Sequence, residues 1–183
     1  MPWTVIPNVP ADAGEYALTR EAFCGVLAEV SLDVSDAEAF LNEAVAFANE
    51  HVWGSLSCVM LVDGATRRRH RAAVEQAIAS LRYGGIGVNV WTGANFALGV
   101  ATWGAYPGNS LENIRSGRGV VHNTMLFDHP EKSVVRGPFR MWPTPVWFAD
   151  HQNLLQLGRL ASRFEAEPSW LKLPAVALAG VKG

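Results

Sequence analysis

The chain has few charged side chains: they make up 17% of its 183 residues, whereas apolar residues make up 49%. Soluble proteins usually carry about 25% charged residues. This shortage predicts that the chain buries apolar surface against another copy or a missing part, or that it folds as a compact α/β domain with hydrophobic strands. The formal net charge of −2 argues against nucleic acid as the main partner.

Cysteine is scarce, and long apolar runs are absent. Cys24 and Cys58 are the two cysteines and lack C-x-x-C spacing, which argues against a disulfide framework and favours a reducing, cytoplasmic location. No stretch reaches the ~18 uninterrupted apolar residues that indicate a membrane span. Met1-Pro2-Trp3 also lacks the basic start of a signal peptide. We therefore expect no membrane partner.

Standard motifs of nucleotide, metal and hydrolytic sites are missing as well. Gly85 and Gly87 are spaced as in G-x-G-x-x-G, but Val90 stands third. G-x-x-x-x-G-K-[ST], H-E-x-x-H and G-x-S-x-G do not occur, and the five histidines show no metal-ligand spacing. We expect no metal site and no complete catalytic centre.

Several reactive side chains have a structural interpretation beside the functional one. A nucleophilic cysteine needs a lowered thiol pKa, yet Cys58 lies in the apolar run 56–62, which favours a small buried hydrophobe. No local motif places a base for Cys24, so a structural role is favoured there too. The basic run 67–71 is either a phosphate-binding patch or, more usually, the solvated start of a helix.

The predicted elements follow the order of a parallel sheet. Strands are predicted over residues 25–33, 56–62 and 86–91. One helix begins at the capping box Ser35-Asp36-Ala37-Glu38 and ends before Gly54, and a second spans residues 67–82. This alternation predicts an α/β fold with a mostly parallel sheet and flanking helices.

Prolines and glycines divide the chain into three parts. Residues 1–19 read as an extended N-terminal arm, and residues 20–136 hold the α/β part. Residues 137–183 combine a Pro/Trp-rich crossing segment, which includes Trp147, with two C-terminal helices, the second interrupted by Pro174. Within the middle part, residues 92–119 predict a long, packed and functional loop, followed by strands near 119–127 and 133–135.

Four segments in order resemble the C-terminal part of the aldehyde dehydrogenase family, in an atypical bacterial branch. Glu21-Ala22-Phe23 matches the start of the family's Glu-x-Phe-Gly-Pro motif. Residues 46–56 look like its Ala-Asn-x-x-x-Tyr-Gly-Leu helix end, and residues 81–89 look like its Leu-x-x-Gly-x-Val-x-Val-Asn strand. Residues 102–107 stand where Pro-Phe-Gly-Gly-x-Lys belongs, so the resemblance covers about residues 20–127.

The resemblance implies roles for five residues. Glu21 would accept a hydrogen bond from the nicotinamide ribose of NAD or NADP, and Phe23 would pack near the nicotinamide. Asn89 would stand at the sheet edge where the family's loop enters the substrate tunnel. Phe96 and Trp103 would wall the substrate, and an aromatic wall suits an apolar aldehyde. The sequence departs from the family's motifs at Cys24, Gly25, Trp53, Thr102, Ala105 and Pro107.

The family's nucleophilic cysteine and its Rossmann-like cofactor unit both precede the Glu-x-Phe motif, and the residues before Glu21 supply neither. Two functions are therefore expected. The first is the C-terminal portion of an NAD(P)-dependent aldehyde dehydrogenase, inactive alone. The second is a non-catalytic assembly module of that fold, since family members oligomerise through strands near the C-terminus. The expected partners are a small-molecule aldehyde and either further copies of the chain or the missing N-terminal part.

Overall fold

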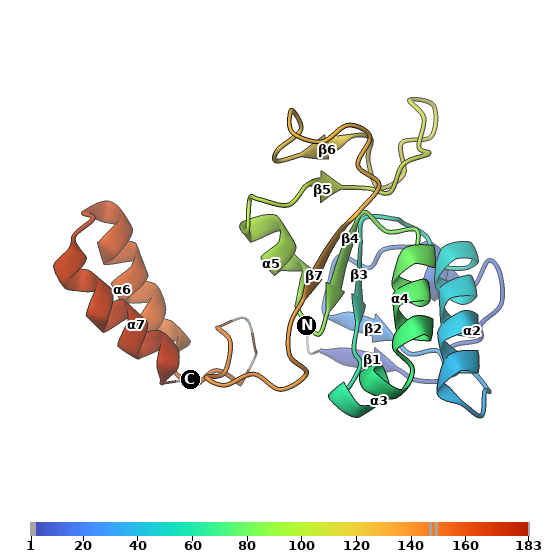
Figure 1. The fold of residues 1–183 in the computed structure, drawn as a ribbon, viewed down its shortest axis with the longest axis horizontal. Helices are drawn as coiled ribbons and strands as arrows, with labels where there is room; N and C mark the ends of the chain where they lie inside the picture. The colour runs from blue at the N-terminus through green and yellow to red at the C-terminus, as the bar shows by residue number, and fades with distance from the viewer. Residues whose placement is uncertain (1–2, 147, 149, 183) are drawn as a thin grey trace. The chain divides into compact units, whose positions relative to one another are not determined.

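The computed structural model describes residues 3–146, 148 and 150–182, and it divides into two compact units, Met1–Gly137 and Pro138–Gly183 (Figure 1). Trp147 of the predicted crossing segment lies outside the described residues. The fold is mixed α/β with mostly parallel strand pairs and a helical C-terminal part, as predicted. The first unit ends one residue after the predicted boundary at residue 136.

A three-stranded parallel sheet forms the centre of the first unit. Its strands are β3 (Ser57–Met60), β4 (Gly85–Val88) and β7 (Ser133–Arg136), in the order β3-β4-β7. The helices α2 (Ala37–Glu50) and α4 (Arg71–Ser80) lie side by side next to this sheet (Figure 1). All three strands, β3, β4 and β7, therefore fall at or inside segments that the sequence predicts as strands.

The hydrophobic core lies between the sheet and these two helices. Alternate residues of each strand point to it, because side chains along a strand alternate between its two faces. Ile86 and Val88 of β4 are fully buried there against Val74 and Ile78 of α4. On the opposite face of β4 stand Gly85 and Gly87, where the short helix α5 (Thr92–Ala97) packs.

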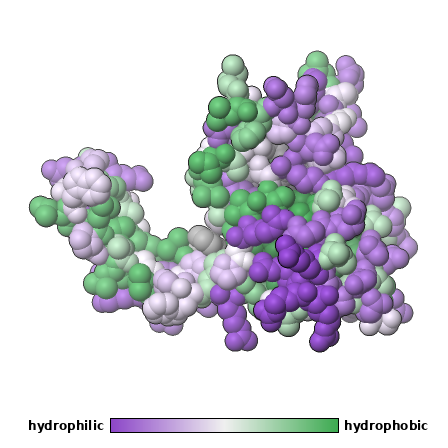
Figure 2. All heavy atoms as spheres, in the orientation of Figure 1, coloured by the Kyte–Doolittle hydropathy of each residue, from purple (hydrophilic) through white to green (hydrophobic). Residues whose placement is uncertain are grey.

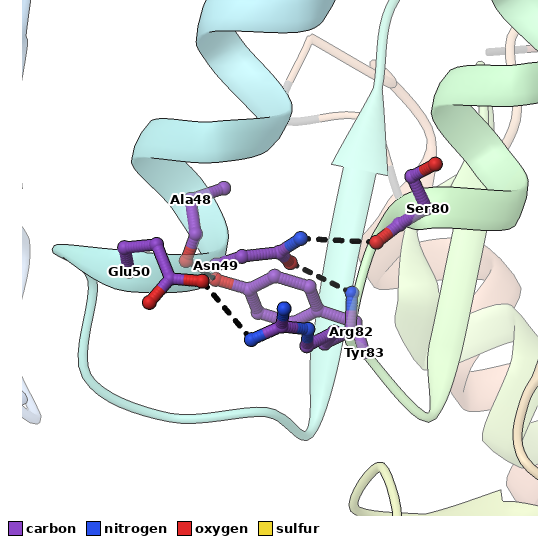
Figure 3. A network of polar contacts seen from close by, with 6 residues as sticks. All are labelled: Ala48, Asn49, Glu50, Ser80, Arg82 and Tyr83. Atoms are coloured by element: carbon purple, nitrogen blue, oxygen red, sulfur yellow. Dashed lines mark hydrogen bonds and ion pairs between the residues drawn. The ribbon is translucent and has the colours of Figure 1, made fainter.

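Side-chain hydrogen bonds join the end of α2 to the start of β4. Figure 3 shows the Asn49 amide between the two segments: its Nδ2 donates to the Ser80 carbonyl at 2.9 Å, and its Oδ1 accepts from the Arg82 amide at 2.8 Å. The Tyr83 hydroxyl donates to the Ala48 carbonyl at 3.0 Å, and Arg82 pairs with Glu50. This network fixes Tyr83 at the entrance to β4.

The N-terminal segment, predicted as an extended arm or linker, is part of the first unit. β1 (Thr4–Ile6) pairs in parallel with β2 (Val26–Ala28), and the short helix α1 (Tyr16–Thr19) follows β1. Val9 and Leu18 are buried. Prolines correctly indicate an absence of long regular structure here, but they carry no information about this long-range pairing.

The predicted helix over residues 67–82 is two helices. α3 (Gly64–Arg69) begins at Asp63, whose Oδ1 accepts from the Ala65 and Thr66 amides, and α4 begins after His70. His70 leaves the helical conformation, with φ −116° and ψ 38°, and its ring contacts Glu38 at 2.9 Å. Three arginines of the basic run, Arg67, Arg68 and Arg69, lie exposed in the last turn of α3, where the helix dipole favours cations, whereas Arg71 begins α4.

The cap of α2 and the glycine-rich stretch 92–119 both differ from what the sequence predicts. The cap of α2 is Asp36, whose Oδ1 accepts from the Glu38 and Ala39 amides, and not Ser35. The glycine-rich stretch 92–119 contains α5 and β5 (Trp103–Gly104), which pairs with β6 (Val120–Val121). β6 is much shorter than predicted, because His122 and Asn123 adopt positive φ and end the strand.

The second unit contains α6 (Leu154–Ala166), the 3₁₀ turn η1 (Trp170–Lys172) and α7 (Leu173–Val181). Buried His151 contacts the Gly180 carbonyl, and Asn153 donates to the Ala179 carbonyl at 2.9 Å, so both tie the start of α6 to the end of α7. The predicted helix over residues 169–181 divides just before Pro174, into η1 and α7. Pro174 stands in the first turn of α7, where proline is tolerated.

Candidate functional site

A cleft with a volume of about 680 Å³ opens at the amino end of β3. Glu21 and Phe23 line it from the segment between α1 and β2, together with Arg20. The Phe23 side chain is 88% exposed, and the residue has φ +47°, a left-handed conformation that is uncommon outside glycine. The structure thus brings the two residues predicted to contact the cofactor to one open cleft.

The floor of the cleft carries two titratable groups, Cys58 and Tyr83. Burial raises the pKa of the Cys58 thiol, so the thiol is protonated at neutral pH and is a poor nucleophile. Burial, followed by the nearby Cys58, raises the pKa of Tyr83 to about 12, against the opposing effect of Arg115. Both groups are therefore neutral at physiological pH. The charge of the cleft comes from the side chains on its walls.

Arg115 lines the cleft from the long loop between β5 and β6 and was not predicted from the sequence. Backbone contacts with Ser55 hold this loop against the cleft: the Ser55 amide donates to Ser116 Oγ at 2.8 Å, and the Tyr106 amide donates to the Ser55 carbonyl at 2.9 Å. A signal for such a turn is present in the sequence as Arg115-Ser116-Gly117. The sequence does not show which segment this turn packs against, because the contact joins residues far apart in the chain.

Asn89 lies at the carboxyl end of β4, the opposite end of the strand from the cleft. It is buried with φ +58°, and its Oδ1 accepts from the Val62 amide at 2.8 Å. Its Nδ2 donates to the carbonyls of Val62 and Gly137 at 2.9 and 3.4 Å. The side chain therefore joins the chain segments that follow β3, β4 and β7, and its role toward a substrate stays a prediction.

Phe96 and Trp103, the two residues predicted to wall the substrate, touch one another. Their ring centroids lie 5.8 Å apart with the planes at 69°, an edge-to-face arrangement. The centroid of the His122 ring lies 5.2 Å from that of Phe96. Neither Phe96 nor Trp103 lines the cleft that holds Glu21. The five predicted site residues thus form two groups and one separate residue, Asn89.

Trp103 reaches β4 because Gly85 leaves room for it. A Cβ atom at Gly85 would lie 3.0 Å from Cζ3 of the indole. Close by in the sequence, Asn95 is fully buried on α5, and its Nδ2 donates to the Ile86 carbonyl at 3.3 Å. The Asn95 Oδ1 and His122 Nδ1 atoms are buried and have no hydrogen-bond partner among the described residues. Sequence patterns do not indicate either of these buried polar atoms.

Comparison with protein-family models, with curated proteins and with solved structures found no match to this chain. Within residues 3–146, 148 and 150–182, no group of three or more His, Cys, Asp or Glu side chains is arranged to hold a metal ion. Among the helices that the structure describes, none combines the length and the apolar character needed to cross a membrane. The function is therefore inferred from the geometry of the cleft.

Proposed function

We propose that this chain is the C-terminal part of an NAD(P)-dependent aldehyde dehydrogenase, an enzyme that oxidises an aldehyde to an acid, and that it forms one wall of the cofactor site. The observation that carries this proposal is the position of Glu21 and Phe23, which line one open cleft. The ordered resemblance over residues 20–127 supports it further. Two unpaired cysteines favour a reducing, cytoplasmic location.

The catalytic nucleophile of such an enzyme would come from outside this chain. Cys58 is protonated in the floor of the cleft, and Cys24 is exposed and does not line it. In this proposal the cleft supplies a carboxylate for the ribose hydroxyls and an aromatic ring beside the nicotinamide. The missing N-terminal part would supply the thiolate and most of the cofactor-binding unit.

The exposed surface of the chain supports association with another polypeptide. Large apolar side chains that are at least 70% exposed include Leu111, Leu126, Leu155 and Leu171. Such side chains contribute to association where they gather into a contiguous surface. The proposed occupant of that surface is the missing part of the enzyme or a second copy of the chain.

A second candidate function is the non-catalytic assembly module, favoured by a specific apolar surface. Figure 2 shows hydrophobic residues gathered over α5 and beside β5, whereas the surface over α3 is mostly hydrophilic. We use the name α5–β6 patch for the exposed apolar residues of α5, of the turn after it and of residues 121–127: Phe96, Leu98, Val100, Val121, Leu126 and Phe127. Exposed apolar surface of this kind often marks an interaction site.

Titration of the full chain with NADH, followed by cofactor fluorescence, tests the first candidate. We expect weak binding, and we expect Glu21→Gln to lower the affinity about tenfold, since a hydrogen bond to a charged group contributes about 1.5–3 kcal/mol. Glu43→Gln, an exposed glutamate of α2 outside the cleft, is the matched control. A stable oligomer that does not bind NADH would instead support the assembly module.

A further inference from the structure

We propose that the cleft beside Glu21 binds an organic anion, a carboxylate or phosphate on an apolar body, and that Arg115 is the anchor for its charge. The inference rests on the proposed function only in placing a ligand in the same cleft. It adds the chemical class of that ligand and a binding residue outside the Glu-x-Phe segment.

The charges of the cleft favour an anion. Three charged side chains line it: Arg20 and Glu21 from one segment, and Arg115 from the β5–β6 loop. The ion pairs between described residues use Arg82, Arg136, His70 and Lys172, so that neither Arg20 nor Arg115 is paired with a carboxylate in the described part of the chain. Guanidinium groups bind carboxylates and phosphates in a bidentate geometry, which suits either of these unpaired arginines to an anion in the cleft.

The backbone at Arg115 is held in place before any ligand binds. It has φ +48°, a left-handed backbone conformation that costs a non-glycine residue energy and persists only where the surroundings impose it. The turn around it closes through a hydrogen bond from the Gly117 amide to the Ile114 carbonyl at 2.9 Å. Asn109 Nδ2 donates to the Gly117 carbonyl at 2.7 Å, and Ser116 is fixed to Ser55. Such preorganisation lowers the entropic cost of binding.

The charge of Arg115 acts on the interior of the cleft. Arg115 lowers the pKa of Tyr83, on the cleft floor, against the larger rise that burial causes. Tyr83 cannot take the place of the anion, because its hydroxyl stays neutral and donates to the Ala48 carbonyl. Cys58 beside it is protonated for the same reason of burial. Among the described residues that line the cleft, Glu21 is therefore the one negatively charged side chain that can balance the arginines.

The walls of the cleft favour an organic ligand over an inorganic ion. Phe23 is 88% exposed and Trp53 is 40% exposed, and both line the cleft with Leu56. An inorganic ion would leave these apolar surfaces in water, whereas an apolar body carrying the anion would cover them. Small-molecule sites commonly combine apolar walls with a few placed polar groups.

The test is a binding titration on the full chain, followed by tryptophan fluorescence because Trp53 lines the cleft. The probes are phenyl phosphate, benzoate and the neutral benzyl alcohol. We expect one or both anions to bind, benzyl alcohol to bind at least tenfold more weakly, and affinity to fall as salt rises. Binding of phenyl phosphate alone would identify a phosphate-bearing ligand such as a nucleotide, and binding of benzoate alone would identify a carboxylate substrate.

The variants Arg115→Met and Arg118→Met separate the anchor from a general effect of charge. Both arginines belong to one loop and are exposed, but Arg118 does not line this cleft. We expect Arg115→Met to weaken anion binding at least tenfold, Arg118→Met to change it less than twofold, and Arg115→Lys to retain part of it. Thermal unfolding of each variant checks that the fold is retained.

The outcomes distinguish this inference from the proposed function. Absence of anion binding, or equal affinity in Arg115→Met and the original chain, would overturn the anion site even if NADH binds in a Glu21-dependent manner. Arg115-dependent anion binding without any NADH binding would support the anion site and count against the dehydrogenase proposal.

Discussion

Two side-chain amides, those of Asn49 and Asn89, hold the junctions of the central sheet. Asn49 joins the last turn of α2 to the end of α4 and the segment that follows it, and Asn89 bridges the segments that follow β3 and β7. An amide suits both places because it offers a donor and an acceptor to one backbone segment. Asn89 also tolerates its left-handed backbone better than most residues would. The family resemblance singled out Asn89 as a residue beside a substrate, and the hydrogen bonds of its amide give it a structural role.

Burial of Tyr83 makes the fold less stable at alkaline pH. Its pKa is raised to about 12 in the folded state, against about 10 in the unfolded chain. The unfolded state therefore ionises first, so this stability is present below about pH 10 and is lost as pH rises toward 12. Between roughly pH 9 and 11 we expect the free energy of unfolding to fall by about 1 kcal/mol more in the original chain than in Tyr83→Phe.

Urea unfolding at both pH values measures this difference. Tyr16→Phe is the control, because Tyr16 is exposed on α1. An equal loss of stability in the original chain and in Tyr83→Phe would show that the Tyr83 hydroxyl is not protected by burial.

At the scale of elements, close backbone contacts between glycines set how β5 and β6 meet the sheet. A Cβ atom at Gly84 would collide with the carbonyl oxygen of Gly104, and one at Gly104 would collide with that of Gly119. Lys132 then fixes the return toward β7: its Nζ donates to the carbonyls of Ile78, Ala79 and Leu81 at 2.5–3.3 Å, at the end of α4. A cation there complements the helix dipole.

We expect Gly84→Ala to destabilise the first unit by about 2–3 kcal/mol or more, because the added methyl group meets backbone that cannot move aside freely. The matched control is Gly64→Ala in the first turn of α3, where a Cβ would meet only the end of the Arg68 side chain at 3.5 Å. We expect that change to be neutral or slightly stabilising. Urea unfolding measures both, and equal stabilities of the two variants would contradict the close contact.

The same elements show where sequence patterns succeed and where they fail. β3, β4 and β7 arise from short apolar or β-branched runs, so their positions were predicted within a few residues. β5 and β6 contain two residues each and have no periodicity to detect. α5 follows Trp91 within a glycine-rich stretch and has no side-chain cap. Its packing on β4, not its propensity, accounts for its presence.

At the scale of the whole molecule, the exposed apolar surface predicts association. We expect the chain to sediment as a homo-oligomer at micromolar concentration, and Leu126→Glu, in the α5–β6 patch, to shift it to the monomer without changing the melting temperature. Leu126 is 72% exposed, so a glutamate there meets water in the free chain. Analytical ultracentrifugation measures the effect.

Leu171→Glu is the control for this experiment, because Leu171 is 90% exposed on η1 in the second unit. Dissociation by Leu171→Glu alone would move the interface to the second unit. A chain that stays monomeric and does not bind a hydrophobic dye would contradict the association.

Composition and local pattern alone determined the α/β class, the mostly parallel pairing of the strands and the apolar strand around the half-buried Cys58, because apolar periodicity and strand-helix alternation are local signals. The tertiary structure alone decided that Glu21 and Phe23 share a cleft with Arg115, and that Phe96 and Trp103 pack together elsewhere. These groupings depend on backbone contacts between segments far apart in the chain, such as those of Ser55 with Ser116 and Tyr106. No local pattern encodes such contacts, because their partners are chosen by packing of the whole unit.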